Sequence, residues 1–416
     1  MQIKSIIASL ALVASVCADH HFLRSNSPAH AHSHNHSALA GRDAYNLLEG
    51  DNNQDGGPKH GALRVPSGSR LRNFTVGDRG EELITYWSNS LSDSQAEQAI
   101  VMFHGKERNG DGYWTIANQV LRSAVNDGFP GANKNTLVIA PQFMSKIRNS
   151  GQYASNQIAF DDVNPWQVGE RATFPKGTSV TSFSAIDNLL DRLADKSKFP
   201  KLQRIVIVGH GGGGQLVTRY AVLGSIPSPS KVAVRLVVGD PSSNLYFTDD
   251  RPLRSSFDAQ GATKGSCPLY NTYRYGFTDL TKYNPTAGSL SPSAYFSRFA
   301  KRDVVFIVGN NDKDPSGDQT CMAHLLGGSA RCDRTFMYWR YINQLAGTTA
   351  SAKLSGFPGK FSSQLPDWSN QTGGQLKAQL TIVPNAQHDP SAVFQNQLGR
   401  AVLFTVGKVP RGGSPQ

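Results

Sequence analysis

The chain has 416 residues and a formal net charge of +11. This length accommodates one large α/β domain or two smaller ones. Its 42 Lys and Arg residues are scattered, without a run of five and without a basic stripe interleaved with aromatic residues, so the charge does not indicate a nucleic-acid partner. Adhesion to an acidic cell wall or polysaccharide surface is a more ordinary consequence of such a charge.

The first 18 residues have the pattern of a secretory signal peptide. Lys4 precedes an apolar run over residues 6–16, and residues 16–18 form a small-residue cleavage site. A membrane anchor needs about 18 or more apolar residues, and neither this run nor any later stretch is long enough. We therefore expect a secreted, extracellular protein without a membrane span.

The cysteines fit an oxidising compartment. Removal of residues 1–18 leaves Cys267, Cys321 and Cys332, of which two are expected to pair. We favour Cys267 with Cys321, although the sequence leaves the other pairings open. Sequons for N-glycosylation begin at Asn35, Asn73 and Asn370.

Residues 19–78 are predicted to form a leader or linker, because their composition is poorly suited to a packed core. Histidines alternate with other residues at positions 30, 32, 34 and 36, and residues 52–58 are rich in Asn, Asp and Gly. An alternating His tract can bind a divalent metal, but this one lacks fixed geometry. We expect no metal site and no cofactor.

Strand and helix patterns alternate over residues 79–407, which predicts a mostly parallel, doubly wound α/β sheet. Expected strands cover residues 99–103, 136–140, 204–208, 234–238, 303–308 and 379–383, and expected helices cover 114–124, 182–194, 215–223, 335–345 and 392–403. Residues 240–300 lack periodicity and read as a lid-like insertion. Residues 408–416 read as a flexible tail. Ligands of such sheets bind beyond the carboxyl ends of the strands.

The central stretch runs from Gln203 to Tyr220. A β-branched strand over residues 205–209 enters a glycine turn, and apolar residues then recur at helical spacing. Such a sharp strand-to-helix turn holds either a catalytic nucleophile or a phosphate. The apex residue is Gly211, which carries no side chain.

The residues at other strand ends favour a catalytic nucleophile over a bound phosphate at this turn. His104-Gly105 leaves the first expected strand and can turn a backbone N–H toward an oxyanion. Asp312 and Asp314 follow a later strand, and His388 follows the last one. A carboxylate can orient a histidine that acts as a base. Turn, acid and histidine occur in the chain order of α/β hydrolases.

These motifs together resemble a family of secreted microbial α/β-hydrolase proteins. The matching segments are Phe103-His-Gly, the turn over residues 209–215, residues 240–246, residues 267–271 and residues 309–312, and the likeness spans roughly residues 80–405. The family's turn reads Gly-His-Ser-x-Gly-Gly-Gln. The resemblance implies an α/β-hydrolase fold, Asp312 as triad acid, His388 as triad base, and the amides of Gly212 and Lys106 as the oxyanion hole.

The chain departs from the family at the nucleophile, where Gly211 replaces serine. One interpretation is a serine ester or amide hydrolase scaffold of low or lost activity that binds a small-molecule or polymer ester or amide ligand. Another is an active hydrolase in which His388, oriented by Asp312, activates water. The sequence does not identify the substrate.

A third interpretation is a dinucleotide site. Gly209-x-Gly211-x-x-Gly214 after a strand matches the fingerprint Gly-x-Gly-x-x-Gly. That site needs an acidic residue about 20 positions on, and Asp240 lies 26 positions beyond Gly214. The fingerprint also usually opens its domain, whereas two strand–helix units precede this one. We therefore favour the hydrolase interpretations.

Overall fold

The computed structural model describes residues 59–161, 164–253, 262–348, 354–361 and 364–415. The expected signal peptide, the His tract and Asn35 lie outside these residues. The strands are β1 (Ser69–Thr75), β2 (Glu82–Ser88), β3 (Gln98–Phe103), β4 (Thr136–Gln142), β5 (Met144–Ser145), β6 (Ala159–Phe160), β7 (Arg204–His210), β8 (Ala233–Gly239), β9 (Asp303–Gly309) and β10 (Gln379–Val383). The longer helices are α2 (Gly110–Asn126), α3 (Ser182–Ala194), α4 (Gly212–Leu223), α6 (Pro292–Ala300), α8 (Arg331–Leu345), α11 (Pro390–Gln395) and α12 (Gln397–Phe404). Single turns form α5 (Leu280–Tyr283), α7 (Cys321–His324), α10 (Ser369–Thr372), η1 (Asp93–Gln95) and η2 (Pro165–Val168).

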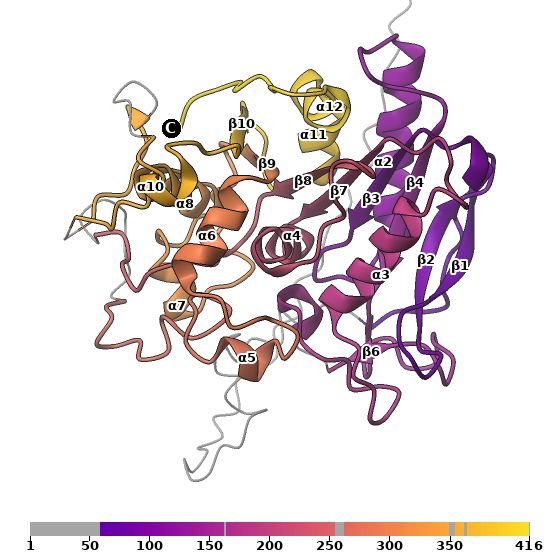
Figure 1. Cartoon of the computed structure of the whole chain (residues 1–416), viewed down its shortest axis with the longest axis horizontal. Coiled ribbons are helices and arrows are strands. Elements are labelled where there is room, and N and C mark those ends of the chain that lie inside the picture. Colours follow the sequence, from indigo (N-terminus) through magenta and orange to yellow (C-terminus); the bar gives the residue numbers. More distant parts are fainter. Residues whose placement is uncertain (1–58, 162–163, 254–261, 349–353, 362–363, 416) are drawn as a thin grey trace, which may run out of the picture. The chain divides into compact units, whose positions relative to one another are not determined.

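Eight strands form the central sheet in the order β1-β2-β4-β3-β7-β8-β9-β10 (Figure 1). Strand β2 pairs antiparallel with both β1 and β4, and all pairs from β4 to β10 are parallel. Helices α3, α4, α6 and α8 contribute to one hydrophobic core, and α2, α11 and α12 contribute to the other. The strand order and the two covered faces confirm the predicted α/β-hydrolase fold.

The six expected parallel strands are all present, and several helices differ from the expected ranges at their ends. Helices α2, α4 and α8 begin three or four residues earlier than their apolar periodicity indicates. The expected helix over residues 392–403 is two helices, because Asn396 is extended and its side chain caps α12 by accepting from the amides of Leu398 and Gly399.

The folded region extends beyond both predicted boundaries. Strand β1 lies in the range assigned to the leader, and its residue Phe74 is buried. Residues of the expected flexible tail bond to β10, because the Ile382 amide donates to the Arg411 carbonyl at 2.7 Å and Gly413 donates to the Ile382 carbonyl at 2.9 Å. The outer strand β1 has a mostly exposed surface, so its hydrophobic signal in the sequence is weak.

The insertion between β8 and β9 is packed, although it is poor in regular structure. Tyr246, Phe247 and Tyr275 are almost fully buried. The rings of Tyr246 and Tyr341 in α8 lie 4.5 Å apart, and Phe247 contacts Phe296 of α6 at 5.0 Å between ring centroids. Aromatic burial therefore anchors this segment to the helices of one sheet face. In the described part of the chain, no helix is both long and apolar enough to cross a bilayer.

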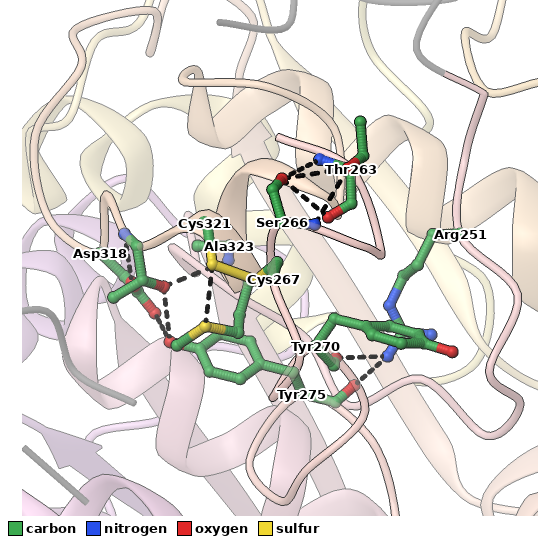
Figure 2. The surroundings of a disulfide bond; sticks show 11 residues. Arg251, Thr263, Ser266, Cys267, Tyr270, Tyr275, Asp318, Cys321 and Ala323 are labelled. Carbon is green, nitrogen blue, oxygen red and sulfur yellow. Dashed lines mark hydrogen bonds between the residues drawn. A yellow bond between two sulfur atoms is a disulfide. The ribbon is translucent and has the colours of Figure 1, made fainter. Parts of the chain in front are cut away.

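A disulfide joins the insertion to the segment after β9, as Figure 2 shows. It links Cys267 to Cys321 with a Cα–Cα distance of 5.8 Å, which confirms the favoured pairing. Beside it, the Tyr275 hydroxyl donates to Asp318 Oδ2 at 2.5 Å (Figure 2). Cys332 is free and buried, and burial raises the pKa of its thiol.

Removing the disulfide should destabilise the protein. The crosslink closes a loop of 54 residues, and crosslinks of this kind contribute about 2–4 kcal/mol to the unfolding free energy. We expect the double substitution Cys267→Ala/Cys321→Ala to cost about this much in urea denaturation. Cys332→Ala, which removes a thiol but no crosslink, is the control. An equal loss in both variants would contradict the stabilising role of the crosslink.

Candidate active site

The apex of the central turn has an unusual backbone conformation. Gly211 follows β7 and precedes α4 with φ +58° and ψ −114°. Its amide donates to the Gly239 carbonyl of β8 at 2.9 Å, and its carbonyl accepts from the Gln215 amide at 2.9 Å. Residues other than glycine rarely adopt this conformation. It is the strained geometry by which a nucleophile elbow projects its apex residue above the sheet.

The glycines around the apex serve close packing. A Cβ on Gly209 would lie 2.0 Å from the Gly213 carbonyl oxygen, and one on Gly214 would lie 2.2 Å from the Gly239 carbonyl oxygen. The first turn of α4 therefore rests directly on the backbone of the strands. This contact accounts for the Gly-x-Gly-x-x-Gly pattern without a phosphate.

His388 faces the apex. A Cβ built on Gly211 would lie 2.9 Å from His388 Nε2 and 3.2 Å from Cε1. The other ring nitrogen, Nδ1, lies 2.9 Å from Asp312 Oδ2. Strand pairing explains this proximity, since Val383 at the end of β10 pairs with Gly309 at the end of β9. The two loops that follow these strands therefore begin side by side.

Asp312 also forms a buried ion pair with Arg331 of α8. The Arg331 Nη1 atom donates to Asp312 Oδ1 at 2.7 Å, and both side chains are at most 3% exposed. Each carboxylate oxygen thus has one partner, His388 or Arg331. The alternative acid, Asp314, is exposed. The structure places Asp312, the acid that the family resemblance implies, at the histidine.

The surroundings disfavour the charged form of His388 and favour the ionised form of Asp312. Burial is the main cause that lowers the pKa of His388, helped by His210 and Arg331 and opposed by Asp312. For Asp312, burial raises the pKa, but the His388 hydrogen bond and the charges of His388 and Arg331 outweigh it and hold the pKa below its ordinary value. A neutral histidine held by a carboxylate is the ground state of a general base.

The His388 ring should titrate below the ordinary histidine pKa of 6.5. Because the folded protein disfavours the charged imidazole, His388 is expected to remain mostly neutral at pH values where an unfolded histidine is half protonated. NMR titration of the imidazole Cε1–H signal, assigned with His388→Asn, measures this midpoint. A midpoint at or above 6.5 would contradict the burial of this ring as the main influence on its pKa.

Lys106 and Gly212 lie next to each other beside the apex. Strand β3 pairs with β7 so that Phe103 lies opposite Gly209, which brings the residues after β3 next to the turn. A Cβ on Gly212 would lie 3.1 Å from the Lys106 amide nitrogen. The structure therefore brings together the two residues predicted to supply the oxyanion hole.

Arg108 braces the loop that carries Lys106. It is 2% exposed and has φ +52°. Its Nη1 atom donates to the Lys106 carbonyl at 2.9 Å and to Asn164 Oδ1 at 2.6 Å, and its Nε donates to Asn149 Oδ1 at 3.1 Å. These bonds fix the loop between β3 and α2 against two distant segments of the chain.

Sequence reasoning missed Arg108, Arg331 and Gln167 of η2, all of which line or support the site. Arg108 follows the His104-Gly105 pair closely, but nothing in its surroundings in the sequence indicates that it points inward. Arg331 begins a helix whose apolar pattern becomes clear only at Thr335. Gln167 lies in an irregular segment without a motif. Only long-range contacts give these residues their places.

The acid required by the dinucleotide interpretation is already occupied. Asp240 is fully buried, its Oδ1 accepts from the Gly309 amide at 2.9 Å, and its Oδ2 lies 3.3 Å from His210 Nε2. A ribose hydroxyl cannot reach this carboxylate. The His210 ring packs in turn against His388, with ring centroids 4.4 Å apart. Asp240 thus contacts His210, and His210 in turn packs against His388.

A cavity of about 380 Å³ opens above these residues. Its volume falls in the range of small-molecule sites. The apolar side chains that line it are Tyr113, Ile116 and Pro390, whereas the rest of the lining is glycine, polar or charged. The predicted lid-like range contributes Ser242 and Arg274. Polar and apolar atoms thus contribute about equally to the cavity wall.

Adding a methyl group at the apex should destabilise the protein. Gly211→Ala introduces a side chain at φ +58° and forces His388 away from a 2.9 Å contact. Backbone strain of this kind costs about 1–3 kcal/mol. Urea denaturation is expected to show a loss in this range. The same substitution at the exposed Gly128, which has φ +63° and open space around its Cβ, reports the backbone contribution without the contact.

No protein-family model matches the chain, and no curated protein matches it. Solved structures with similar architecture include poly(aspartic acid) hydrolase-1 from Sphingomonas sp. KT-1, with a TM-score of 0.48 and 16% identity over 79% of this chain and 96% of that one. LpqC, a poly(3-hydroxybutyrate) depolymerase from Bordetella parapertussis, has a TM-score of 0.48 and 16% identity over 83% and 92%. The siderophore hydrolase EstB from Aspergillus nidulans has a TM-score of 0.36 and 11% identity over 80% and 93%. The strand order and the elbow geometry, rather than these likenesses, identify the α/β-hydrolase fold.

Proposed function

We propose that this protein is a serine ester or amide hydrolase scaffold that binds its ligand but has lost nucleophilic catalysis. The observation that carries the proposal is the apex: His388 Nε2 faces Gly211 at the position of a nucleophile, with Asp312 on the opposite ring nitrogen, and glycine has no oxygen to activate. Loss of a triad serine costs about 10⁶-fold in turnover. The ligand is a small-molecule or polymer ester or amide, and the arginines Arg274 and Arg331 in the cavity lining favour one with a polar acyl part.

The test compares the unmodified protein with its His388→Ala variant. We expect no covalent labelling of either protein by a fluorophosphonate probe, and equal, very slow hydrolysis of p-nitrophenyl acetate by both. Labelling of the unmodified protein would overturn the proposal, since it requires a nucleophile that Gly211 does not provide.

A second candidate function is hydrolysis by activated water. It is favoured by the orientation of His388, whose Nε2 makes no hydrogen bond to any residue in the described ranges and faces the open apex. In this mechanism the histidine takes a proton from water as the water attacks the ligand carbonyl, and the amides of Gly212 and Lys106 stabilise the resulting oxyanion. Ester hydrolysis that the unmodified protein performs and His388→Ala does not, without probe labelling, would establish this function in place of the first.

We further propose that the protein is secreted and acts outside the cell. The signal-like residues 1–18, the Cys267–Cys321 disulfide and the sequons support this location. Asn73 and Asn370 are both exposed. Edman sequencing of protein from the culture medium should begin at Asp19. The net charge of +11 supports retention on an acidic wall or polysaccharide, which salt elution from such a matrix would test.

A further inference from the structure

Gln167 is a mostly buried residue whose side-chain amide lies at the wall of the cavity. It lies in η2, is 4% exposed and lines the cavity. Its side-chain amide makes no hydrogen bond to any residue within the described ranges, although its backbone amide donates to the Asn164 carbonyl at 3.1 Å. Most buried polar groups in folded proteins are paired with protein or with water. The Gln167 amide is open to the cavity, so its N–H donors are available to a ligand there.

The side chain reaches the space beside the elbow. A Cβ on Gly212 would lie 2.8 Å from Gln167 Nε2 and 3.1 Å from the Lys106 amide nitrogen. Glycine at position 212 therefore leaves the room that the Gln167 amide occupies. The Lys106 amide nitrogen and Gln167 Nε2 therefore both lie beside Gly212, the other predicted oxyanion donor. N–H groups that are grouped in this way can bind an anionic oxygen.

The position of Gln167 relative to the other donors is fixed by the fold. Asn164, at the start of the same turn, has φ +50° and accepts from the Trp166 indole at 3.0 Å. Arg108 donates both to Asn164 and to the Lys106 carbonyl. One buried guanidinium thus ties the Gln167 turn to the Lys106 loop. Held in this way, donors need no rearrangement when charge arrives between them.

We propose that Gln167 is a third donor of the oxyanion site, and that the unmodified protein uses this site to hold a ligand carboxylate. One carboxylate oxygen is bound by the Gln167 side chain with the Gly212 and Lys106 amides, and the cations Arg274 and Arg331 line the same cavity. A carboxylate is the anion that ester or amide hydrolysis leaves on the acyl group. This inference rests on the proposed function, because it concerns the same acyl site.

The first experiment titrates the unmodified protein with butyrate by calorimetry, with methyl butyrate as the neutral comparison. A hydrogen bond to a charged group contributes about 10- to 100-fold in affinity. We expect Gln167→Met, which keeps the side-chain volume but removes the donor, to weaken the affinity for butyrate by this factor. Gln167→Glu should abolish butyrate binding by charge repulsion. Gly212→Ala should act like Gln167→Met, because its methyl group displaces the amide. Melting temperatures identify any variant that fails to fold.

The second experiment places Gln167→Met in the Gly211→Ser variant and measures the rate of fluorophosphonate labelling. Removal of one oxyanion donor should slow labelling by about 10²-fold. If Gly211→Ser is never labelled, the proposed function fails, whereas butyrate affinity still decides the role of Gln167. If the unmodified protein does not bind butyrate, the carboxylate assignment is overturned. Labelling and affinity that are both unchanged by Gln167→Met overturn the donor assignment.

Discussion

Gly211→Ser is expected to make the protein react covalently with a fluorophosphonate and hydrolyse p-nitrophenyl acetate. The serine hydroxyl would project from the elbow toward His388 Nε2, which is already oriented by Asp312 at 2.9 Å. Because a triad serine contributes about 10⁶-fold to turnover, a gain of at least about 10³-fold over the unmodified protein is expected even with imperfect alignment. Gel fluorescence of the labelled protein and the rate of nitrophenolate release measure it.

The imidazole must retreat for this gain to appear, since the new Cβ would otherwise lie 2.9 Å from Nε2. This movement is inexpensive, because Nε2 is the far end of a side chain that is 29% exposed. Gly211→Ala is the matched control: it has the same Cβ and backbone strain but no hydroxyl, and should remain unlabelled. Absence of labelling in a folded Gly211→Ser protein would refute the assignment of this turn as a nucleophile elbow.

The second large effect concerns His388 and Asp312, the base and the acid next to the introduced serine. In the Gly211→Ser background, His388→Ala should remove most of the gain in kcat/KM, a loss of at least about 10³-fold, because the serine loses its base. Asp312→Asn should cause a loss of similar size, since the histidine loses the partner that fixes its tautomer and stabilises its charged form. Steady-state kinetics with p-nitrophenyl acetate measure both losses.

Asp314→Asn provides the control, since this exposed carboxylate lies two residues away but not at the histidine. We expect its kcat/KM to stay within about twofold of the Gly211→Ser parent. A large loss in Asp314→Asn, together with little change in Asp312→Asn, would reverse the assignment of the acid. Circular dichroism is needed for Asp312→Asn, because this substitution also leaves Arg331 without its buried partner.

The sequence was informative wherever function coincides with a strand end. Buried parallel strands are recognisable by continuous β-branched runs, and the residues that follow them must meet at one edge of the sheet. Gly211, His388 and one of two aspartates, Asp312 or Asp314, could therefore be placed together before any contact was known. The choice of Asp312 came from the family resemblance.

What the sequence did not reveal depends on long-range contacts. Arg108 gains its position from hydrogen bonds to segments more than 40 residues away, such as the one to Asn164, and no local periodicity records such a contact. Through Asn164 the same bond fixes the turn that carries Gln167. Strand β1 was not predicted for a different reason. Its side chains are mostly exposed at the sheet edge, so its composition resembles that of a linker. The break at Asn396 was likewise hidden, because an apolar pattern continues through the cap.

The ion pair with Arg331 gives Asp312 a structural role that does not depend on catalysis. A chain that had stopped catalysing would still need this carboxylate, because its loss strands a buried guanidinium and weakens the fold. His388 is partly exposed, and within the described residues its side chain hydrogen-bonds to Asp312, so the fold depends less on this histidine than on the aspartate. Among natural variants of this protein, drift at position 388 would therefore be the earlier sign that the site has fallen out of use. Retention of Asp312 alone would not show that the site is still catalytic.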